Sequence, residues 1–76
     1  MRLNSEQVNI LKEELYAELV EILMDEWRYS MQEALGVLYN SDTFLLIQDE
    51  GTGLYYQSAG YVYSFLEEEL KTGKVA

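Results

Sequence analysis

The chain lacks cysteine and histidine altogether, and these two absences narrow what the protein can be. Without cysteine no disulfide can stabilise the fold, and without histidine as well the usual structural zinc sites cannot form. Catalysis would have to rely on Asp, Glu, Ser, Thr, Tyr and Lys, since the most frequent general base and the most reactive nucleophile are missing. We therefore expect a protein that is not an enzyme and that carries no cofactor or metal.

Basic residues are scarce: five lysines and arginines stand against 14 aspartates and glutamates, giving a net charge of −9. Affinity for nucleic acid normally comes from Lys and Arg that neutralise phosphates, and a negative protein repels DNA and anionic membranes. The helix, turn and helix expected over residues 30–48 contain no Lys or Arg to contact DNA. The sequence predicts no direct nucleic-acid or membrane binding and favours a basic protein partner.

Long apolar runs are also missing. No stretch approaches the ~18 residues of a membrane span, and the N-terminus has no apolar run typical of a signal peptide. We therefore expect a cytoplasmic protein. Hydrophobic residues nevertheless make up 49% of the chain, which is typical of a folded domain, and 76 residues allow a single domain over positions 1–76. A domain this small buries only about 60 to 65% of its surface, so dimerisation or a partner would reinforce it.

A long amphipathic helix is predicted from about Glu6 to Trp27, after the capping residues Asn4 and Ser5. Its apolar residues recur at three- and four-residue spacing and cover more than half of the circumference. They are Val8, Leu11, Leu15, Tyr16, Leu19, Val20, Ile22, Leu23, Met24 and Trp27. A helix this broadly apolar needs cover on two sides, from a bundle or from a second subunit. We expect a homodimer through this helix, which contains Leu15 and Leu19.

Acidic residues form a narrow strip on the opposite side of this helix: Glu14, Glu18, Glu21 and Asp25. Like charges at this spacing destabilise an isolated helix by roughly 0.2 to 0.5 kcal/mol per pair. A strip maintained at that cost is a candidate docking site for a basic partner. The alternative is a face that is acidic only because it is solvated.

A second helix is predicted to begin after Ser30, which forms a capping box with Glu33, and to end near Tyr39 or Asn40. Its Gly36 is expected to permit close approach of another helix. A last helix is predicted from Ser58, its N-cap, to about Lys71, with Gly73 as its stop signal. The acidic side chains near its end, from Glu67 to Glu69, are interpreted mainly as solvated.

The segment between these helices has two interpretations. Ser41 or Asp42 can cap a short helix that ends near Gln48 or Asp49. Residues 43–47 and 54–57 could instead pair as a hairpin. The favoured fold class is therefore all-α, a small bundle of one long and three shorter helices. The alternative is α+β with a hairpin at about residues 43–57.

Tyrosines in the second half are further candidates for a recognition surface, because tyrosine is enriched in binding hot spots. Neighbouring tyrosines diverge on a helix, so both members of a pair cannot be core. We expect Tyr61 to point inward and Tyr63 outward, and a patch of Leu54, Tyr55 or Tyr56 with Tyr63 at the surface. The alternative is that half-buried tyrosines simply cover a small core.

A family resemblance is carried by three short runs, at residues 33–35, 39–44 and 52–58, followed by the closing acidic helix. Over residues 30–70 the chain resembles a group of short uncharacterised bacterial proteins. Members of that group are similar to proteins encoded beside toxin-like genes, so the resemblance implies an antitoxin or accessory role. The matching positions are mostly caps, turns and core, and no catalytic residue is implied.

Together these observations favour a non-enzymatic protein–protein interaction module, antitoxin-like or regulatory, that binds a basic partner. Its candidate partner-binding residues are Glu14, Glu18, Glu21, Asp25, Tyr55, Tyr56 and Tyr63. Two alternatives belong to other classes. One is a structural homo-oligomer, and the other is an anionic mimic of nucleic acid that occupies the binding site of a basic protein.

Overall fold

The computed structural model describes residues 3–73 and places four α-helices and two short 3₁₀ helices in them. The α-helices are α1 (Ser5–Trp27), α2 (Met31–Tyr39), α3 (Asp42–Gln48) and α4 (Ala59–Thr72), and the 3₁₀ helices are η1 (Glu50–Thr52) and η2 (Leu54–Tyr56). No strand occurs among the described residues. The all-α prediction of one long and three shorter helices is confirmed, and the alternative hairpin at residues 43–57 is wrong.

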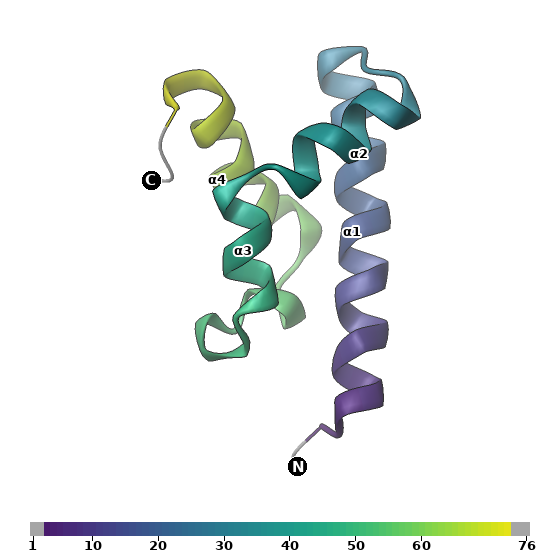
Figure 1. The fold of residues 1–76 in the computed structure, drawn as a ribbon, viewed down its shortest axis with the longest axis vertical. Coiled ribbons are helices and arrows are strands. Elements are labelled where there is room, and N and C mark those ends of the chain that lie inside the picture. Colours follow the sequence, from purple (N-terminus) through teal and green to yellow (C-terminus); the bar gives the residue numbers. More distant parts are fainter. Residues whose placement is uncertain (1–2, 74–76) are drawn as a thin grey trace.

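The long helix α1 sets the shape of the molecule, which measures 38 × 24 × 18 Å (Figure 1). Helix α2 crosses the C-terminal half of α1, and α3 and α4 lie side by side next to it, while the first turns of α1 extend past the other elements. Helix α1 packs against α2, η2 and α4. Within residues 3–73, no helix has the length and apolar character needed to cross a membrane.

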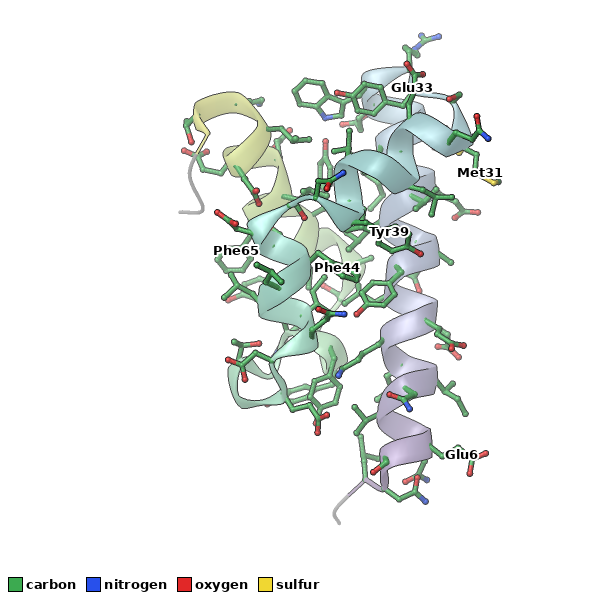
Figure 2. All side chains as sticks on the ribbon, viewed as in Figure 1. Glu6, Met31, Glu33, Tyr39, Phe44 and Phe65 are labelled. Atoms are coloured by element: carbon green, nitrogen blue, oxygen red, sulfur yellow. The ribbon has the colours of Figure 1, made fainter. Side chains whose placement is uncertain are left out.

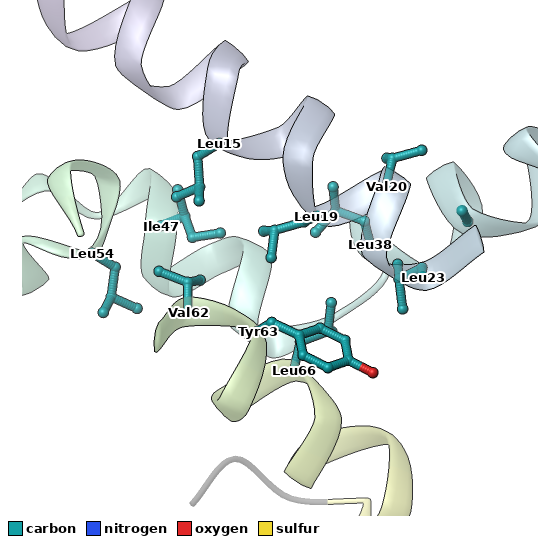
Figure 3. Close-up of a cluster of buried hydrophobic side chains, with 11 residues drawn as sticks. Leu15, Leu19, Val20, Leu23, Leu38, Ile47, Leu54, Val62, Tyr63 and Leu66 are labelled. Atoms are coloured by element: carbon teal, nitrogen blue, oxygen red, sulfur yellow. The ribbon is translucent and has the colours of Figure 1, made fainter. Parts of the chain in front are cut away.

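All six elements except η1 contribute to one hydrophobic core (Figure 3). Its side chains are Leu15, Leu19, Val20, Leu23, Ala34, Leu38, Ile47, Leu54, Val62, Tyr63 and Leu66. Leu19 is completely buried and Leu15 is 4% exposed. Other elements of the same chain cover these two leucines, so a homodimer through α1 would have to use other residues of the helix, and it stays a prediction.

Local capping signals determine where most helices begin. A capping box in which Asn4 pairs with Gln7 starts α1, and Ser30 with Glu33 starts α2 as predicted. Ser41 caps α3 and Ser58 caps α4, each through its side-chain oxygen. Each cap satisfies a backbone N–H that has no partner inside the helix. The predicted boundaries of these helices are confirmed to within about two residues.

The end of α1 was not signalled by glycine. Arg28 follows the helix in the left-handed conformation with φ 58°, which is uncommon for a residue with a side chain. On either side of it, the Trp27 and Tyr29 rings stack with centroids 6.0 Å apart. Ring stacking and the capping box at Ser30 hold this tight connection in place of a glycine.

Glu69 links α4 to the start of α3. Its Oε2 accepts a hydrogen bond from the backbone N–H of Asp42 at 2.7 Å, and its Oε1 accepts from the N–H and the hydroxyl of Thr43 at 2.9 and 2.8 Å. A carboxylate is favourable here because the N-terminus of a helix carries a partial positive charge. The interpretation of Glu69 as a solvated side chain is therefore wrong, since it caps another helix.

Gly36 does not serve a helix contact in this chain. A Cβ atom built on it would have no neighbour within 4 Å, so the expected close approach of another helix is absent among the described residues. Gly36 lies inside α2, where glycine is about 1 kcal/mol less favourable than alanine.

We expect Gly36→Ala to raise the free energy of unfolding by about 0.5 to 1 kcal/mol, measured by urea denaturation. Gly53→Ala is the comparison variant and should lower the free energy of unfolding. Gly53 has φ 70°, and a Cβ atom on it would lie 2.7 Å from the Tyr56 hydroxyl oxygen. A destabilised Gly36→Ala variant would show that the space above Gly36 is occupied in solution.

Candidate partner-binding surface

The four acidic residues of the predicted strip are exposed along α1, and we refer to Glu14, Glu18, Glu21 and Asp25 as the acidic ridge. None of the four makes a hydrogen bond or ion pair with another described residue. Several acidic residues elsewhere have partners. Glu33 closes a capping box, Glu50 and Glu67 pair with lysines, and Glu69 caps α3. The negative charge without an internal role is thus concentrated on α1.

Two predicted tyrosines lie beside the ridge. Glu14 and Glu18 line a shallow pocket of about 180 Å³ together with Tyr55, Tyr56 and the start of α4. We call this hollow the tyrosine pocket. The structure therefore brings together four of the candidate residues, although Tyr55 and Tyr56 are about 40 positions from the glutamates in sequence.

The exposed ring of Tyr56 is held in place by its neighbours. It packs edge-to-face on Tyr55 with centroids 5.1 Å apart and lies directly over Gly53, whose missing side chain makes room for it. Gly53 also takes a left-handed φ of 70°, which glycine adopts at little cost. A ring fixed before binding loses less conformational entropy when a partner covers it.

Tyr63 and Leu54 do not belong to this surface, because both are buried in the core (Figure 3). Tyr63 is 8% exposed, and its hydroxyl accepts a 2.9 Å hydrogen bond from Nε1 of Trp27. Burial raises the pKa of Tyr63, while the Trp27 hydrogen bond lowers it by a smaller amount. Tyr61 is 52% exposed and packs edge-to-face on Phe65 instead. The predicted orientation of Tyr61 inward and Tyr63 outward is therefore wrong.

A larger groove lies on the other side of the acidic ridge, between α1 and α2, and its volume is about 420 Å³. Its wall on α1 is formed by Tyr16, Ala17, Val20 and Met24. Its wall on α2 is formed by Met31, Leu35 and Tyr39. Glu13 and Glu21 are the charged residues of its lining. We call this hollow the α1/α2 groove.

Two of the most exposed apolar side chains of the molecule line this groove. Met31 is 60% exposed and Tyr39 is 53% exposed. Met31 points outward, and Tyr39 lies between α2 and α1 (Figure 2). Large apolar side chains exposed around a hollow are typical of interaction sites. Methionine in particular adapts its shape to different partners.

Two aromatic side chains of the groove lining pack against Phe44 of α3. The Phe44 ring contacts Tyr16 with centroids 4.9 Å apart and Tyr39 with centroids 5.1 Å apart. Burial, and to a smaller extent the nearby Tyr39, raise the pKa of Tyr16. Aromatic contacts thus link two groove residues, one on α1 and one on α2, to α3.

The sequence identified the ridge and the two tyrosines Tyr55 and Tyr56, but neither of the two hollows. Glu21 is the one ridge residue that lines the groove, and Asp25 lines neither hollow. A signal for the groove was present in the width of the apolar arc on α1. Val20 and Met24 widen that arc, and both line the groove together with Ala17, a small residue between Glu13 and Glu21.

The surface shows no arrangement for metal binding, since no group of three or more Asp or Glu side chains in residues 3–73 could hold an ion. Comparisons of the chain with known protein families, with curated proteins and with solved structures found no match. The function must therefore be inferred from the surface itself.

Proposed function

We propose that this protein is a non-enzymatic interaction module that binds a basic protein partner through the exposed side of α1. The observation that carries the proposal is the position of the acidic ridge between two hollows lined by aromatic and apolar side chains. Carboxylates without internal partners attract a basic protein and steer its approach, while the hollows supply area that is buried on contact.

An antitoxin-like or regulatory accessory protein is the concrete form of this proposal. It draws on the resemblance of residues 30–70 to short bacterial proteins similar to those encoded beside toxin-like genes. Toxin-like enzymes that act on nucleic acid carry positive charge, which attracts an acidic module and favours its approach.

The anionic-mimic alternative requires carboxylates spread over a whole face like phosphates. The ridge is instead a single row on α1, and the surface on one side of it is mostly apolar. This arrangement favours a mixed interface, in which charge guides the approach and apolar contact provides affinity, over mimicry of a phosphate backbone.

A purification from the native host tests the proposal with a matched pair of baits. The ridge variant carries Glu14→Gln, Glu18→Gln, Glu21→Gln and Asp25→Asn, and it should fold normally because removing like charges relieves repulsion. We expect one stoichiometric basic protein to co-purify with the wild type and to be lost with the ridge variant. Retention by both baits, or recovery of the protein alone as an oligomer, would contradict the proposal.

Competition with DNA separates the module from the mimic. Duplex DNA added to the purified complex should leave it intact if the contact is a protein-specific interface. Complete displacement by DNA at moderate salt would instead support mimicry of nucleic acid.

A further inference from the structure

The α1/α2 groove has dimensions that suit one helix. Its wall on α1 runs from Glu13 to Met24, a span of about 16 Å at about 1.5 Å per residue, which is three turns. Both walls are helices, and residues 3–73 contain no open sheet edge to which an extended peptide could add. Helices recognise such grooves through apolar side chains at three- and four-residue spacing.

Ala17 is the position where a docked helix could come closest to α1. It is exposed and stands one turn from Glu13 on one side and one turn from Glu21 on the other. Its small side chain leaves a depression between two carboxylates on the same face of α1. A helix that inserts an apolar side chain over Ala17 would have positions one turn before and one turn after it near a glutamate.

The charges on the groove select against a second copy of this chain. Each copy has a net charge of −9, and a symmetric pair would place acidic α1 surfaces near each other. Residues 3–73 also contain no basic helix. Helices α2 and α3 contain no Lys or Arg, and the lysines of α1 and α4, Lys12 and Lys71, already pair with glutamates.

We propose that the α1/α2 groove binds an amphipathic helix of the partner, whose apolar residues lie over Ala17, Val20 and Met24. The partner helix carries Arg or Lys one turn before and one turn after the residue that lies over Ala17. This inference rests on the proposed function, because it names the part of the basic partner that is recognised. The tyrosine pocket is then a secondary contact, while the groove provides most of the buried apolar area.

A binding experiment with a designed peptide tests the groove directly. The probe is a fluorescent peptide of about 14 residues, roughly four helical turns, with an apolar face of leucines and with a lysine one turn before and one turn after the central leucine. A scrambled peptide of the same composition measures attraction due to charge alone. Titrations by fluorescence anisotropy at about 0.15 M salt limit long-range attraction, because the Debye length is then about 8 Å.

Variants of α1 separate groove binding from general attraction. Ala17→Trp fills the groove without a change of charge, and Asn9→Trp places the same side chain at an exposed position of α1 outside the groove lining. We expect Ala17→Trp to weaken peptide binding at least tenfold and Asn9→Trp to leave it within a factor of two. Equal affinity in both variants would overturn the inference.

Charge variants test the two groove glutamates, Glu13 and Glu21, in the same way. The pair Glu13→Gln with Glu21→Gln and the control pair Glu6→Gln with Glu26→Gln each remove two negative charges from α1. We expect the first pair to weaken peptide binding severalfold more than the control. Equal losses, or equal binding of the scrambled peptide, would show that attraction is diffuse and would overturn the inference.

Sedimentation of the free protein tests whether a second copy of the chain occupies the groove. We expect a monomer, and a dimer that Ala17→Trp converts to monomer would show that a second copy fills the groove and would overturn the inference. These results are independent of the purification above. If the native partner depends on the ridge but binds Ala17→Trp normally, the proposed function stands and the groove assignment falls.

Discussion

Leu19→Asp will abolish the folded state. Leu19 is completely buried near the middle of α1 and points into the core shared by all four α-helices (Figure 3). Burying an unpaired carboxylate costs several kcal/mol even after the surroundings relax, and the apolar contacts of the leucine are lost as well. A domain of this size is stable by roughly 5 to 10 kcal/mol at most, so the substitution consumes most or all of that stability.

Circular dichroism and the fluorescence of the sole tryptophan, Trp27, report the loss. Ile10→Asp is the matched control, since Ile10 is on the same helix but is 48% exposed, and it should cost less than about 1 kcal/mol. Leu19→Ala provides a graded variant, expected to cost about 2 to 5 kcal/mol. A Leu19→Asp protein with wild-type helicity and an unchanged unfolding midpoint would contradict the assigned core.

Protein concentration distinguishes an intrachain core from a dimer interface. If Leu15 and Leu19 are covered by their own chain, the unfolding midpoint of the Leu19→Ala variant will not change with concentration. A dimer interface would give a midpoint that rises with concentration, because association stabilises the folded state by mass action. This measurement bears directly on the homodimer that the broad apolar face of α1 suggested.

Local signals explain why the helices were predictable. Each α-helix follows a residue whose side chain accepts a hydrogen bond from a backbone N–H of the first turn. The two residues of such a pair lie within four positions of each other, so the sequence shows them directly. Residues 43–47 were ambiguous because a short apolar run suits a buried strand as well as a helix. Ser41 favours the helix by capping α3. Glu69 provides a second cap, which could not be predicted because it lies 26 residues from Thr43 in the sequence.

The wrong orientation of Tyr61 and Tyr63 has a physical cause in α4. Phe65 lies one turn from Tyr61, so an inward face that includes the apolar Phe65 also includes Tyr61. Phe65 is only half-buried and pairs with Tyr61 near the surface. The true inward face is centred on Val62 and Leu66, and Tyr63 reaches the core because Trp27 supplies a donor for its hydroxyl. That donor comes from α1, so the spacing of residues within α4 does not indicate it.

The candidate site was predictable in its charge but not in its shape. The acidic ridge follows from spacing on one helix, so the sequence locates it fully. The tyrosine pocket and the α1/α2 groove require residues from separate elements to meet, and the packing of α2 and η2 against α1 determines where they do. Spacing within one segment contains no information about that packing.

Removal of the Glu69 carboxylate is the second substitution with a large expected effect. Its three hydrogen bonds hold the start of α3, a helix of seven residues that is too short to be stable alone. Hydrogen bonds to a charged group contribute about 1.5 to 3 kcal/mol, and loss of this carboxylate also leaves the buried hydroxyl of Thr43 without an acceptor. We expect Glu69→Ala to lower the free energy of unfolding by about 2 to 3 kcal/mol in urea denaturation.

Neighbouring substitutions isolate the cap from the loss of charge. Glu68→Gln and Glu69→Gln remove the same charge from the same helix, but Glu68 is exposed and its carboxylate caps no described residue. We expect Glu68→Gln to be nearly neutral. Glu69→Gln should cost about 1 to 2 kcal/mol, because an amide NH₂ cannot accept the hydrogen bond that one carboxylate oxygen receives. Equal effects of the two glutamine variants would contradict the capping role.

A double-mutant cycle with Thr43→Val then measures the link between α3 and α4. Thr43→Val removes one of the donors to Glu69 while keeping the shape of the buried side chain. If the cap acts as described, the two substitutions will be less than additive, since the second removes a contact that the first has already broken. Faster hydrogen exchange at the Asp42 and Thr43 amides in Glu69→Ala would locate the loss at the start of α3, whereas unchanged exchange there would place it elsewhere.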